Sequence, residues 1–372
     1  MVRISDIFKI PKSHPAPEEK PKKRSAKEIA PLPPSDSVLP PDAETQKEHT
    51  GSQKPDDIYI TRAMEETAKD KARSQNLYLM GIQLAKMVLA NADKLIAVNL
   101  VQVKHWVSEM VDCLIFLDVD LLQLFYEYAS DDYLHSHMVN TVIMATEIGS
   151  GIGYNSLKLN ELGLAAFLHD IGMIKVEEIV KQKERLTEEE YNKIKSHPVY
   201  GAEILSKIKD ITDPVIYVAR EEHERSNGSG YPKGIKENRI SEYARIVSIV
   251  DAYEALSHDR PYRKKYSPHE AIKELIKNNV LFDSGILKVL LNKVGIYPVS
   301  SWLELNSNEI GQVAVNNNEN PLRPMVNIIF DGTGRKLSEP RIINLAKQFN
   351  LFIKKALSDE DLGRLMGGCL RV

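Results

Sequence analysis

The sequence predicts a mainly α-helical protein, in which a helical bundle with additional N-terminal helices precedes a small C-terminal appendage of mixed α and β structure. Three observations predict it. Apolar residues recur at three- and four-residue steps through the middle of the chain, as on one face of a helix. Short β-like runs begin only after Pro298, and a Pro- and Lys-rich stretch fills the start. A chain of 372 residues with 42% hydrophobic content can bury a sizeable core.

The N-terminal segment, residues 1–56, is predicted to be a disordered Pro/Lys-rich tail. Nine of the 19 prolines fall before residue 42, mixed with Lys, Glu and Ser. Such a stretch buries too little apolar surface to offset the entropy of ordering it. At its start, Ile4, Ile7 and Phe8 fit one face of a short amphipathic turn. Two interpretations stay open there: a docking peptide for protein partners, or an unstructured end.

Residues 57–130 are predicted to be helical. Trp106, Met110, Leu114 and Leu117 follow one another at helical spacing. These helices either pack on the next domain or mediate self-association as a homodimer, and core packing is the favoured interpretation.

Residues 131–294 are again helix-rich, with Gly and Pro marking loops, and residues 295–372 form the appendage. There SWLEL, GQVAV and PMVNIIF are strand-like runs, and FDGTG supplies an Asp-Gly turn. A final helix is expected at about 340–357.

The overall balance of charge and cysteine excludes several classes of protein. With 49 basic and 52 acidic residues, the net charge of −3 gives no reason to expect a nucleic-acid-binding surface. The two cysteines, Cys113 and Cys369, are far apart, which fits a reducing compartment. No apolar run reaches the roughly 18 residues of a membrane span, and the start lacks a signal-peptide core. We therefore expect a cytoplasmic protein without a membrane span.

Five clusters of metal-capable side chains lie between residues 137 and 251. Each sits beside a helical run, so helices could project them into one bundle interior. A lone histidine of this kind is more often a core residue, but the ordered series of His and Asp favours a site. Imidazole with carboxylate suits Fe, Mn or Zn, and two such ions can activate a hydroxide toward phosphorus. The clusters are His137, His169-Asp170, His197, Glu222-His223-Glu224 and Asp251.

The sequence motifs around these residues resemble those of the HD-GYP branch of the HD superfamily of metal-dependent phosphohydrolases. They are YLHSHMVN, FLHDIGM, LTEEEYNKIKSHPVYGAEIL, EEHERSNGSGYPKGI and ARIVSIVDAYEALSHDRPYR. The C-terminal stretch beginning YPVSSWLEL also resembles the β appendage that often ends such domains. The resemblance implies an HD-type helical bundle over residues 131–294.

The resemblance also implies a dinuclear site with two divalent ions, Fe or Mn, and Asp170 as the bridging ligand. His169 and Asp170 would be the catalytic pair, and Gly230, Tyr231 and Pro232 would form a substrate loop. The implied activity is hydrolysis of cyclic di-GMP to pGpG, GMP or both, through a metal-activated hydroxide. The implied metal ligands are His137, His169, Asp170, His197, His223 and Asp251, with Glu222 as an extra ligand.

Arg260 and Arg263 in DRPYR have two open interpretations. Guanidinium groups suit a phosphate or a guanine edge, so both could bind substrate. They could equally form structural pairs with Asp or Glu.

The chain departs from the family pattern at three positions. Met173 stands where a lysine usually follows HD-x-G, and Lys175 points to a different helix face. Glu222 replaces the first of two histidines, which adds negative charge. Tyr133 stands where members with a third metal carry Glu, so two metals are expected.

These departures keep an alternative open: a catalytically impaired domain that acts as a cyclic di-GMP sensor or a protein-interaction module. Hydrolysis of another nucleotide or cyclic dinucleotide is a third interpretation, since such a site is generic for phosphoesters.

Overall fold

The computed structural model describes residues 55–92, 100–116, 124–126, 133–181, 187–259, 263–317, 319–358 and 360–364. The predicted amphipathic turn, nearly all of the predicted tail, Leu117, Arg260 and Cys369 lie outside these residues. None of the described helices combines the length and the apolar character needed to cross a membrane. The boundaries proposed for the tail and the other segments stay predictions.

The region predicted to be helical before residue 131 contains two long helices, α2 (Pro55–Ala92) and α3 (Leu100–Phe116). On α3, Trp106 and Met110 are each only 1% exposed, and Leu114 packs against the same core. The Trp106 indole donates to the backbone oxygen of Leu77 on α2 at 2.8 Å. The expectation that this apolar face packs into a core is confirmed for these three residues.

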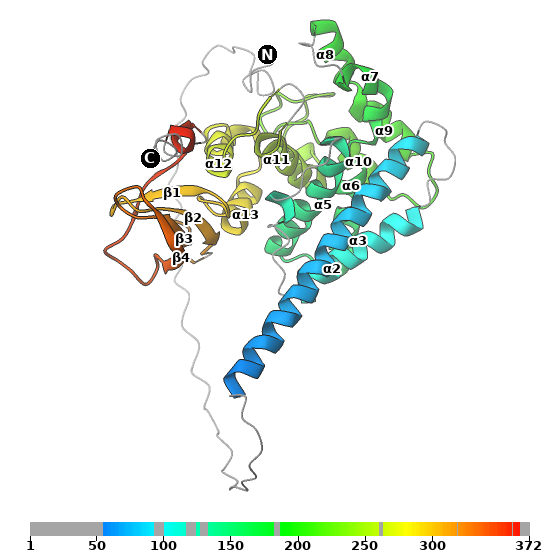
Figure 1. Cartoon of the computed structure of the whole chain (residues 1–372). Helices are drawn as coiled ribbons and strands as arrows, with labels where there is room; N and C mark the ends of the chain where they lie inside the picture. The colour runs from blue at the N-terminus through cyan, green and yellow to red at the C-terminus, as the bar shows by residue number, and fades with distance from the viewer. Residues whose placement is uncertain are drawn as a thin grey trace, which may run out of the picture. The chain divides into compact units, whose positions relative to one another are not determined.

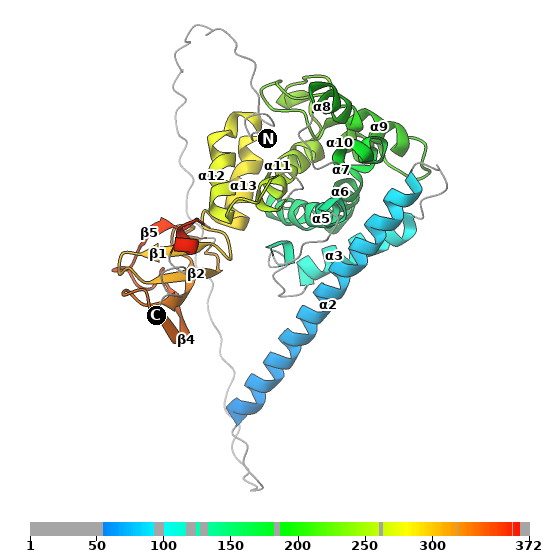
Figure 2. The ribbon, with the colours of Figure 1, turned by 45° about the horizontal axis from the view of Figure 1, so that its top comes forward.

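The middle of the chain is a helical bundle. Helices α5, α6, α10 and α11 pack against one another and lie side by side in both ribbon views (Figures 1 and 2). One continuous apolar core runs through them and includes the buried faces of α2 and α3. The helices are α5 (Tyr133–Ile152), α6 (Ser156–Leu168), η1 (Ile171–Val176), α7 (Glu177–Lys181), α8 (Glu188–Ile194), α9 (His197–Leu205), α10 (Asp213–Glu221), η2 (Glu237–Arg239), α11 (Glu242–Ser257), α12 (Pro268–Lys277), η3 (Asn279–Leu281) and α13 (Ser284–Val294).

Side-chain caps fix where several of these helices begin. Thr187 and Ser267 each form a reciprocal capping box, with Glu190 and Glu270 three residues on. Asn155 and Asp283 accept hydrogen bonds from backbone N–H groups in the first turns of α6 and α13. The caps satisfy N–H groups that have no partner within the helix.

The appendage is a five-stranded antiparallel sheet with its own small core, in the order β4-β3-β2-β1-β5. The three strand-like runs and the Asp-Gly turn are confirmed as β1, β2, β3 and the turn after β3. The strands are β1 (Trp302–Leu305), β2 (Ile310–Val315), β3 (Met325–Phe330), β4 (Lys336–Asn344) and β5 (Ile353–Ala356).

The prediction of a helix at about 340–357 is wrong, because that stretch contains the end of β4 and all of β5. Ile343 is buried while its neighbour Ile342 is 63% exposed, which is the alternation of a strand. Pairing of β4 with β3 and of β5 with β1 closes the small core around Leu303 and Leu305. Tertiary pairing therefore overrides the local helical spacing.

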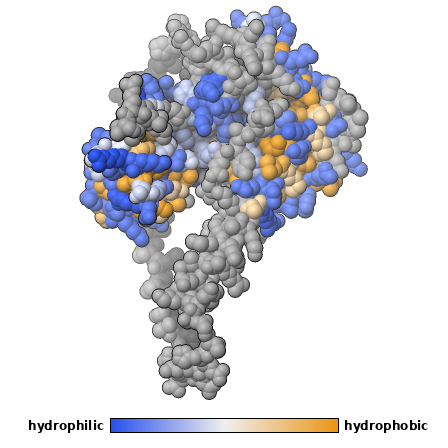
Figure 3. All heavy atoms as spheres, viewed as in Figure 1, coloured by the Kyte–Doolittle hydropathy of each residue, from blue (hydrophilic) through white to orange (hydrophobic). Residues whose placement is uncertain are grey.

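The face drawn in Figure 3 carries hydrophobic residues interleaved with hydrophilic ones. Exposed apolar side chains occur on the helices, such as Val101 at 73%, and on the sheet segment, such as Phe349 at 77%. Single exposed apolar residues of this kind are ordinary on protein surfaces.

Candidate metal centre

The seven side chains predicted as metal ligands come together in the interior of the helical bundle. His137 lies on α5 and Asp251 on α11, whereas the other five lie at the ends of helices. His169 follows α6 and Asp170 precedes η1, His197 opens α9, and Glu222 and His223 follow α10. In two groups, the ligand atoms all lie within 4.8 Å of one another: His137, His169 and Asp251, and Asp170, His197, Glu222 and His223.

A glycine contact explains how Asp170 and His197 meet. A Cβ at Gly172 would lie 2.1 Å from the backbone oxygen of His197 and 2.5 Å from the nitrogen of Gly201. Only a residue without a side chain lets η1 rest on the first turn of α9. This close approach leaves Oδ1 of Asp170 at 3.3 Å from Nε2 of His197.

Each of three carboxylates points its two oxygens at different imidazoles. Asp170 turns Oδ1 to His197 and Oδ2 to His137, the latter at 3.4 Å from Nε2. Glu222 turns Oε1 to His197 at 3.3 Å and Oε2 to His169 at 3.5 Å. Each carboxylate thus spans the space between two imidazole groups.

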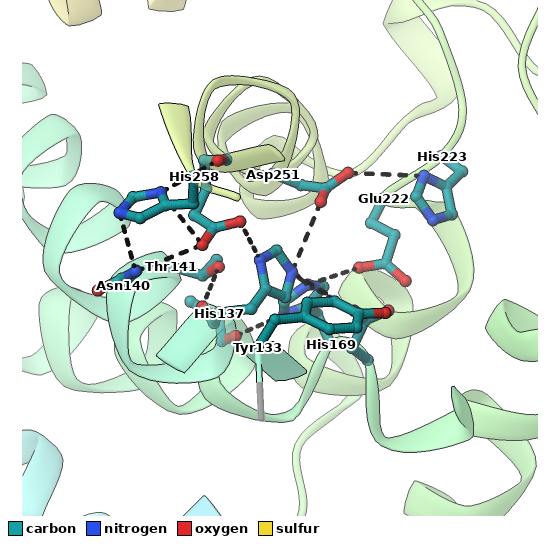
Figure 4. A network of polar contacts seen from close by, with 12 residues as sticks. Tyr133, His137, Asn140, Thr141, His169, Glu222, His223, Asp251 and His258 are labelled. Carbon is teal, nitrogen blue, oxygen red and sulfur yellow. Dashed lines mark hydrogen bonds and ion pairs between the residues drawn. The ribbon is translucent and has the colours of Figure 1, made fainter. Parts of the chain in front are cut away.

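Asp251 has the same arrangement (Figure 4). Its Oδ1 lies 3.5 Å from Nε2 of His137, and its Oδ2 lies 3.8 Å from Nδ1 of His223. Asp251 comes from the middle of α11 and reaches across to α5 and to the end of α10.

The histidine rings are oriented by acceptors on their far side. Nδ1 of His137 lies 2.6 Å from a carboxylate oxygen of Glu254. Nδ1 of His169 and Nδ1 of His197 lie 2.6 and 2.7 Å from the backbone oxygens of Ala166 and Ile194. Because those oxygens only accept, a neutral ring places its N–H there and leaves Nε2 as a lone pair facing inward.

Inward-facing nitrogen atoms lie opposite one another, and those of His137 and His169 are both acceptors. Nε2 of His137 is 3.1 Å from Nε2 of His169, and Nε2 of His197 is 3.1 Å from Nε2 of His223. Oε2 of Glu222 is fully buried without a hydrogen-bond partner. Opposed lone pairs beside carboxylate oxygens repel unless a cation lies between them, so the donor set fits divalent metal ions.

Asp170 is held in its charged form. Burial alone would raise the pKa of its carboxyl group. The neighbouring imidazoles of His169, His137 and His197 outweigh burial, so this pKa lies well below its ordinary value. An ionised carboxylate between two imidazole groups is the form that ligates a metal.

For Glu222 and His223, unlike Asp170, burial in the cluster favours the neutral form of the side chain. Burial raises the pKa of Glu222 well above its ordinary value; His169 opposes this, while Asp170 and Asp251 add to it. Burial also lowers the pKa of His223, which favours the neutral ring that metals bind. Negative charge at Glu222 is therefore costly here without a cation.

The predicted substrate loop packs directly on the ligand segment. A Cβ at Gly230 would lie 2.4 Å from the backbone oxygen of His223, so only glycine fits this approach. The Tyr231 ring stacks on the His223 ring with centroids 4.7 Å apart. The Glu224 carboxylate accepts from the backbone N–H groups of Lys233 and Ile235 and so holds the loop rather than facing the cluster.

The remaining predicted residues lie elsewhere. Pro232 is exposed next to Tyr231. The Arg263 guanidinium donates to the backbone oxygens of Ala255, Leu256 and Lys264. Its role as a substrate ligand stays a prediction.

A polar network behind His137 was missed at the level of sequence (Figure 4). Glu254 also accepts from Asn140 at 3.3 Å, and the Tyr78 hydroxyl on α2 donates to Asn140 at 2.9 Å. His258 lies 3.3 Å from Glu254 and 2.7 Å from the backbone oxygen of Phe125. The signal was spacing: Asn140 follows His137 by three residues, and Glu254 follows Asp251 by three, so each pair shares a helix face.

The chain is similar to known proteins over much of its length. Residues 122–286 match the HD domain family, and residues 302–365 match a KOW domain associated with the HD domain. The chain is 31% identical over 228 residues to the cyclic di-GMP phosphodiesterase PA4108 of Pseudomonas aeruginosa, covering 61% of this chain and 55% of that protein. It is 32% identical over 236 residues to the cyclic di-GMP phosphodiesterase PdeB of Borreliella burgdorferi, covering 63% of this chain and 62% of the relative.

The chain thus spans little more than half the length of these curated relatives. A solved structure with the same fold is Bd1817, an HDG"Y"P protein from Bdellovibrio bacteriovorus. It superposes with a TM-score of 0.51 at 20% identity, over 63% of this chain and 78% of that one. At that identity the likeness concerns the fold alone.

Proposed function

We propose that this chain, in which residues 122–286 match the HD domain family, is a metal-dependent phosphodiesterase of the HD-GYP kind that hydrolyses cyclic di-GMP. The proposed products are pGpG, GMP or both. The observation that carries the proposal is Asp170, whose two oxygens face the imidazoles of His197 and His137 separately, at 3.3 and 3.4 Å.

The proposed ligand sets follow from these contacts. His137, His169 and Asp251 would hold one ion, and His197, His223 and Glu222 would hold the other. Asp170 would contact both. When bound, two divalent ions supply Lewis-acid polarisation of the phosphoryl oxygens and a water of lowered pKa as nucleophile.

The chain's own residues prepare this chemistry by fixing ligand orientation. Glu254 and the backbone oxygens of Ala166 and Ile194 hold three imidazoles with Nε2 inward. Tyr231 covers the ring of His223 and so restricts its rotation. Ligands held in place before the metal binds lose little freedom on binding.

We propose Fe or Mn as the metal, because the donors are imidazoles and hard carboxylates without thiolate. Cyclic di-GMP would approach from the side of the loop that contains Gly230, Tyr231 and Pro232, with Arg260 and Arg263 as further candidate contacts. A docking role for the N-terminal tail, a homodimer and a cytoplasmic location stay predictions.

A second candidate function is binding of cyclic di-GMP without turnover. Met173, in place of a lysine, packs partly buried against the apolar core. Glu222 is fully buried and adds a carboxylate to the cluster. Both features lower the positive potential that would stabilise charge developing on a phosphate, which is often the largest catalytic effect.

The deciding experiment measures metal content and cyclic di-GMP turnover on protein purified without air. We expect two ions per chain and pGpG or GMP as chromatographically identified product. Asp170→Asn keeps the side chain's shape but should lose metal and product, whereas the exposed control Glu203→Gln should keep both. Two ions per chain with the cyclic dinucleotide left intact over hours would contradict the phosphodiesterase and support the binding function.

A further inference from the structure

The position that lacks a lysine is filled by a partly buried apolar residue. Met173 follows the His169-Asp170 pair on η1 and packs against the apolar cluster. Its neighbour Lys175 is exposed. The proposed divalent ions would attract an anionic substrate beside the three carboxylates, and a cation from the protein would add to that attraction where water is scarce.

Lys195 brings a cation to this place from another element. It ends α8 and lies two residues before His197. Its Nζ atom is 4.6 Å from the centroid of the Tyr191 ring and 5.7 Å from the centroid of the Tyr231 ring. Tyr231 itself stacks on His223, so a single aromatic ring separates the ammonium group from a proposed metal ligand.

Within the described part of the chain, no carboxylate oxygen lies within 4.0 Å of the Lys195 Nζ atom, so no described acid pairs with its charge. Lys193, two residues earlier, instead pairs with Glu189 at 2.9 Å. Lys195 is also half-buried, whereas the side chain of Lys193 is 58% exposed.

Arg225, another cation near the cluster, already has hydrogen-bond acceptors within the protein. Arg225 is buried and donates to the backbone oxygens of Glu222 and Glu224 and to the Ser248 hydroxyl. These hydrogen bonds hold the ligand segment in shape. A lysine over two aromatic rings keeps its N–H donors available, because a cation–π contact uses only its charge.

We propose that Lys195 binds a phosphate oxygen of the substrate and so takes the part of the cation that Met173 cannot supply. The inference rests on the proposed function, since it names a substrate-positioning residue of the same site. Lysine is a point-charge phosphate binder with a long flexible stem, so a small movement off the Tyr231 ring suffices to meet the anion.

The test compares Lys195→Met with Lys195→Arg and with the surface control Lys193→Met. Metal content and the dissociation constants of cyclic di-GMP and of inorganic phosphate are measured by mass spectrometry and calorimetry. Lys195→Met should keep the metal and the melting temperature, because it retains an apolar stem between the rings. It should weaken binding of both anions about tenfold, roughly 1.4 kcal/mol. Lys195→Arg should lose less, and Lys193→Met should match the parent protein.

A second arm places a cation at the position that lacks one. Met173→Lys combined with Lys195→Met should recover part of the lost affinity. If Lys195→Met binds both anions as tightly as the parent protein, or if Lys175→Met loses affinity in its place, the inference is overturned.

The outcomes separate this inference from the proposed reaction. Binding of phosphate that depends on Lys195, without turnover of cyclic di-GMP, would uphold the inference and overturn the proposed activity. If Lys195→Met turns over cyclic di-GMP with the KM and kcat of the parent protein, the proposed activity is upheld and the role of Lys195 is overturned. A metal-loaded parent protein that binds neither anion would overturn both.

Discussion

The carboxylate of Glu254 lies 2.6 Å from Nδ1 of His137, and both groups are almost completely buried. Glu254 therefore fixes the tautomer of His137 and turns its Nε2 atom toward Asp170 and Asp251. It is a positioning residue, because it acts on the metal through the histidine.

Removing this carboxylate should weaken metal binding. Glu254→Ala is expected to lower metal affinity about 10- to 100-fold, the range found for partners of metal-bound histidines. Glu254→Gln retains an acceptor oxygen and should lose less. Affinity is measured by competition with a chelator, with Glu203→Gln as the exposed control. Equal affinity in Glu254→Ala and the control would contradict this role.

Filling the contact at Gly172 should separate η1 from α9. A Cβ there would lie 2.1 Å from the His197 backbone oxygen, so the backbone must move in Gly172→Ala. We expect a loss of about 1–3 kcal/mol in unfolding free energy together with loss of metal. Gly363→Ala is the control, because a Cβ added at Gly363 would meet nothing within 4 Å. Denaturant unfolding measures the loss of stability, and metal analysis measures the loss of metal. A Gly172→Ala protein that is fully loaded with metal would contradict the prediction.

Removing metal should destabilise the protein, because the opposed acceptors are then left without a cation between them. An ion present at about 100 times its dissociation constant adds about 2.7 kcal/mol of stability by mass action. Thermal unfolding with and without chelator should show this loss, which metal restores. In Asp170→Asn, chelator should change the melting temperature only slightly. If chelator does not change the melting temperature of the parent protein, the prediction of a bound metal is contradicted.

Alkaline pH should weaken the fold through Tyr253. Its side chain is fully buried with its hydroxyl 2.6 Å from that of Tyr126, and burial raises its pKa far above the ordinary value. Since the unfolded chain ionises at about pH 10, the contribution of neutral Tyr253 is complete below that pH and is lost as pH rises toward the folded pKa.

Thermal unfolding measured on both sides of about pH 10 checks this. Stability should fall above it, and less in Tyr253→Phe, which has no ionisable hydroxyl. Tyr200→Phe, at a side chain that is 37% exposed, is the control. An equal fall in all three proteins would exclude Tyr253 as the cause.

The sequence was sufficient to locate the proposed metal ligands, because each lies in a short motif at a helix end or on a helix face. His169 and Asp170 adjoin Gly172, and His197 adjoins Gly201, so the contact that joins them is encoded locally on both sides. The bundle was predictable for the same reason, since helical periodicity is a local property.

What the sequence could not show depends on distant partners. Glu254 and His258 lie within a quoted motif, but their roles and that of Tyr78 arise only when α2, α5 and α11 meet. The stretch from 340 to 357 has helix-like spacing, but its neighbours in space are strands. Which cation lies near the predicted substrate loop is likewise decided by the fold, which places Lys195 beside Tyr231.

The contact between α2 and α3 has a practical consequence for choosing a minimal fragment. Trp106 on α3 packs with its ring centroid 5.1 Å from that of Phe167, two residues before His169. Gly81 on α2 lies so close that an added Cβ would meet the Trp106 ring at 2.4 Å. A fragment cut at the family match, residues 122–286, would strip this covering and leave Phe167 in water. The smallest unit worth expressing therefore starts upstream of Tyr78.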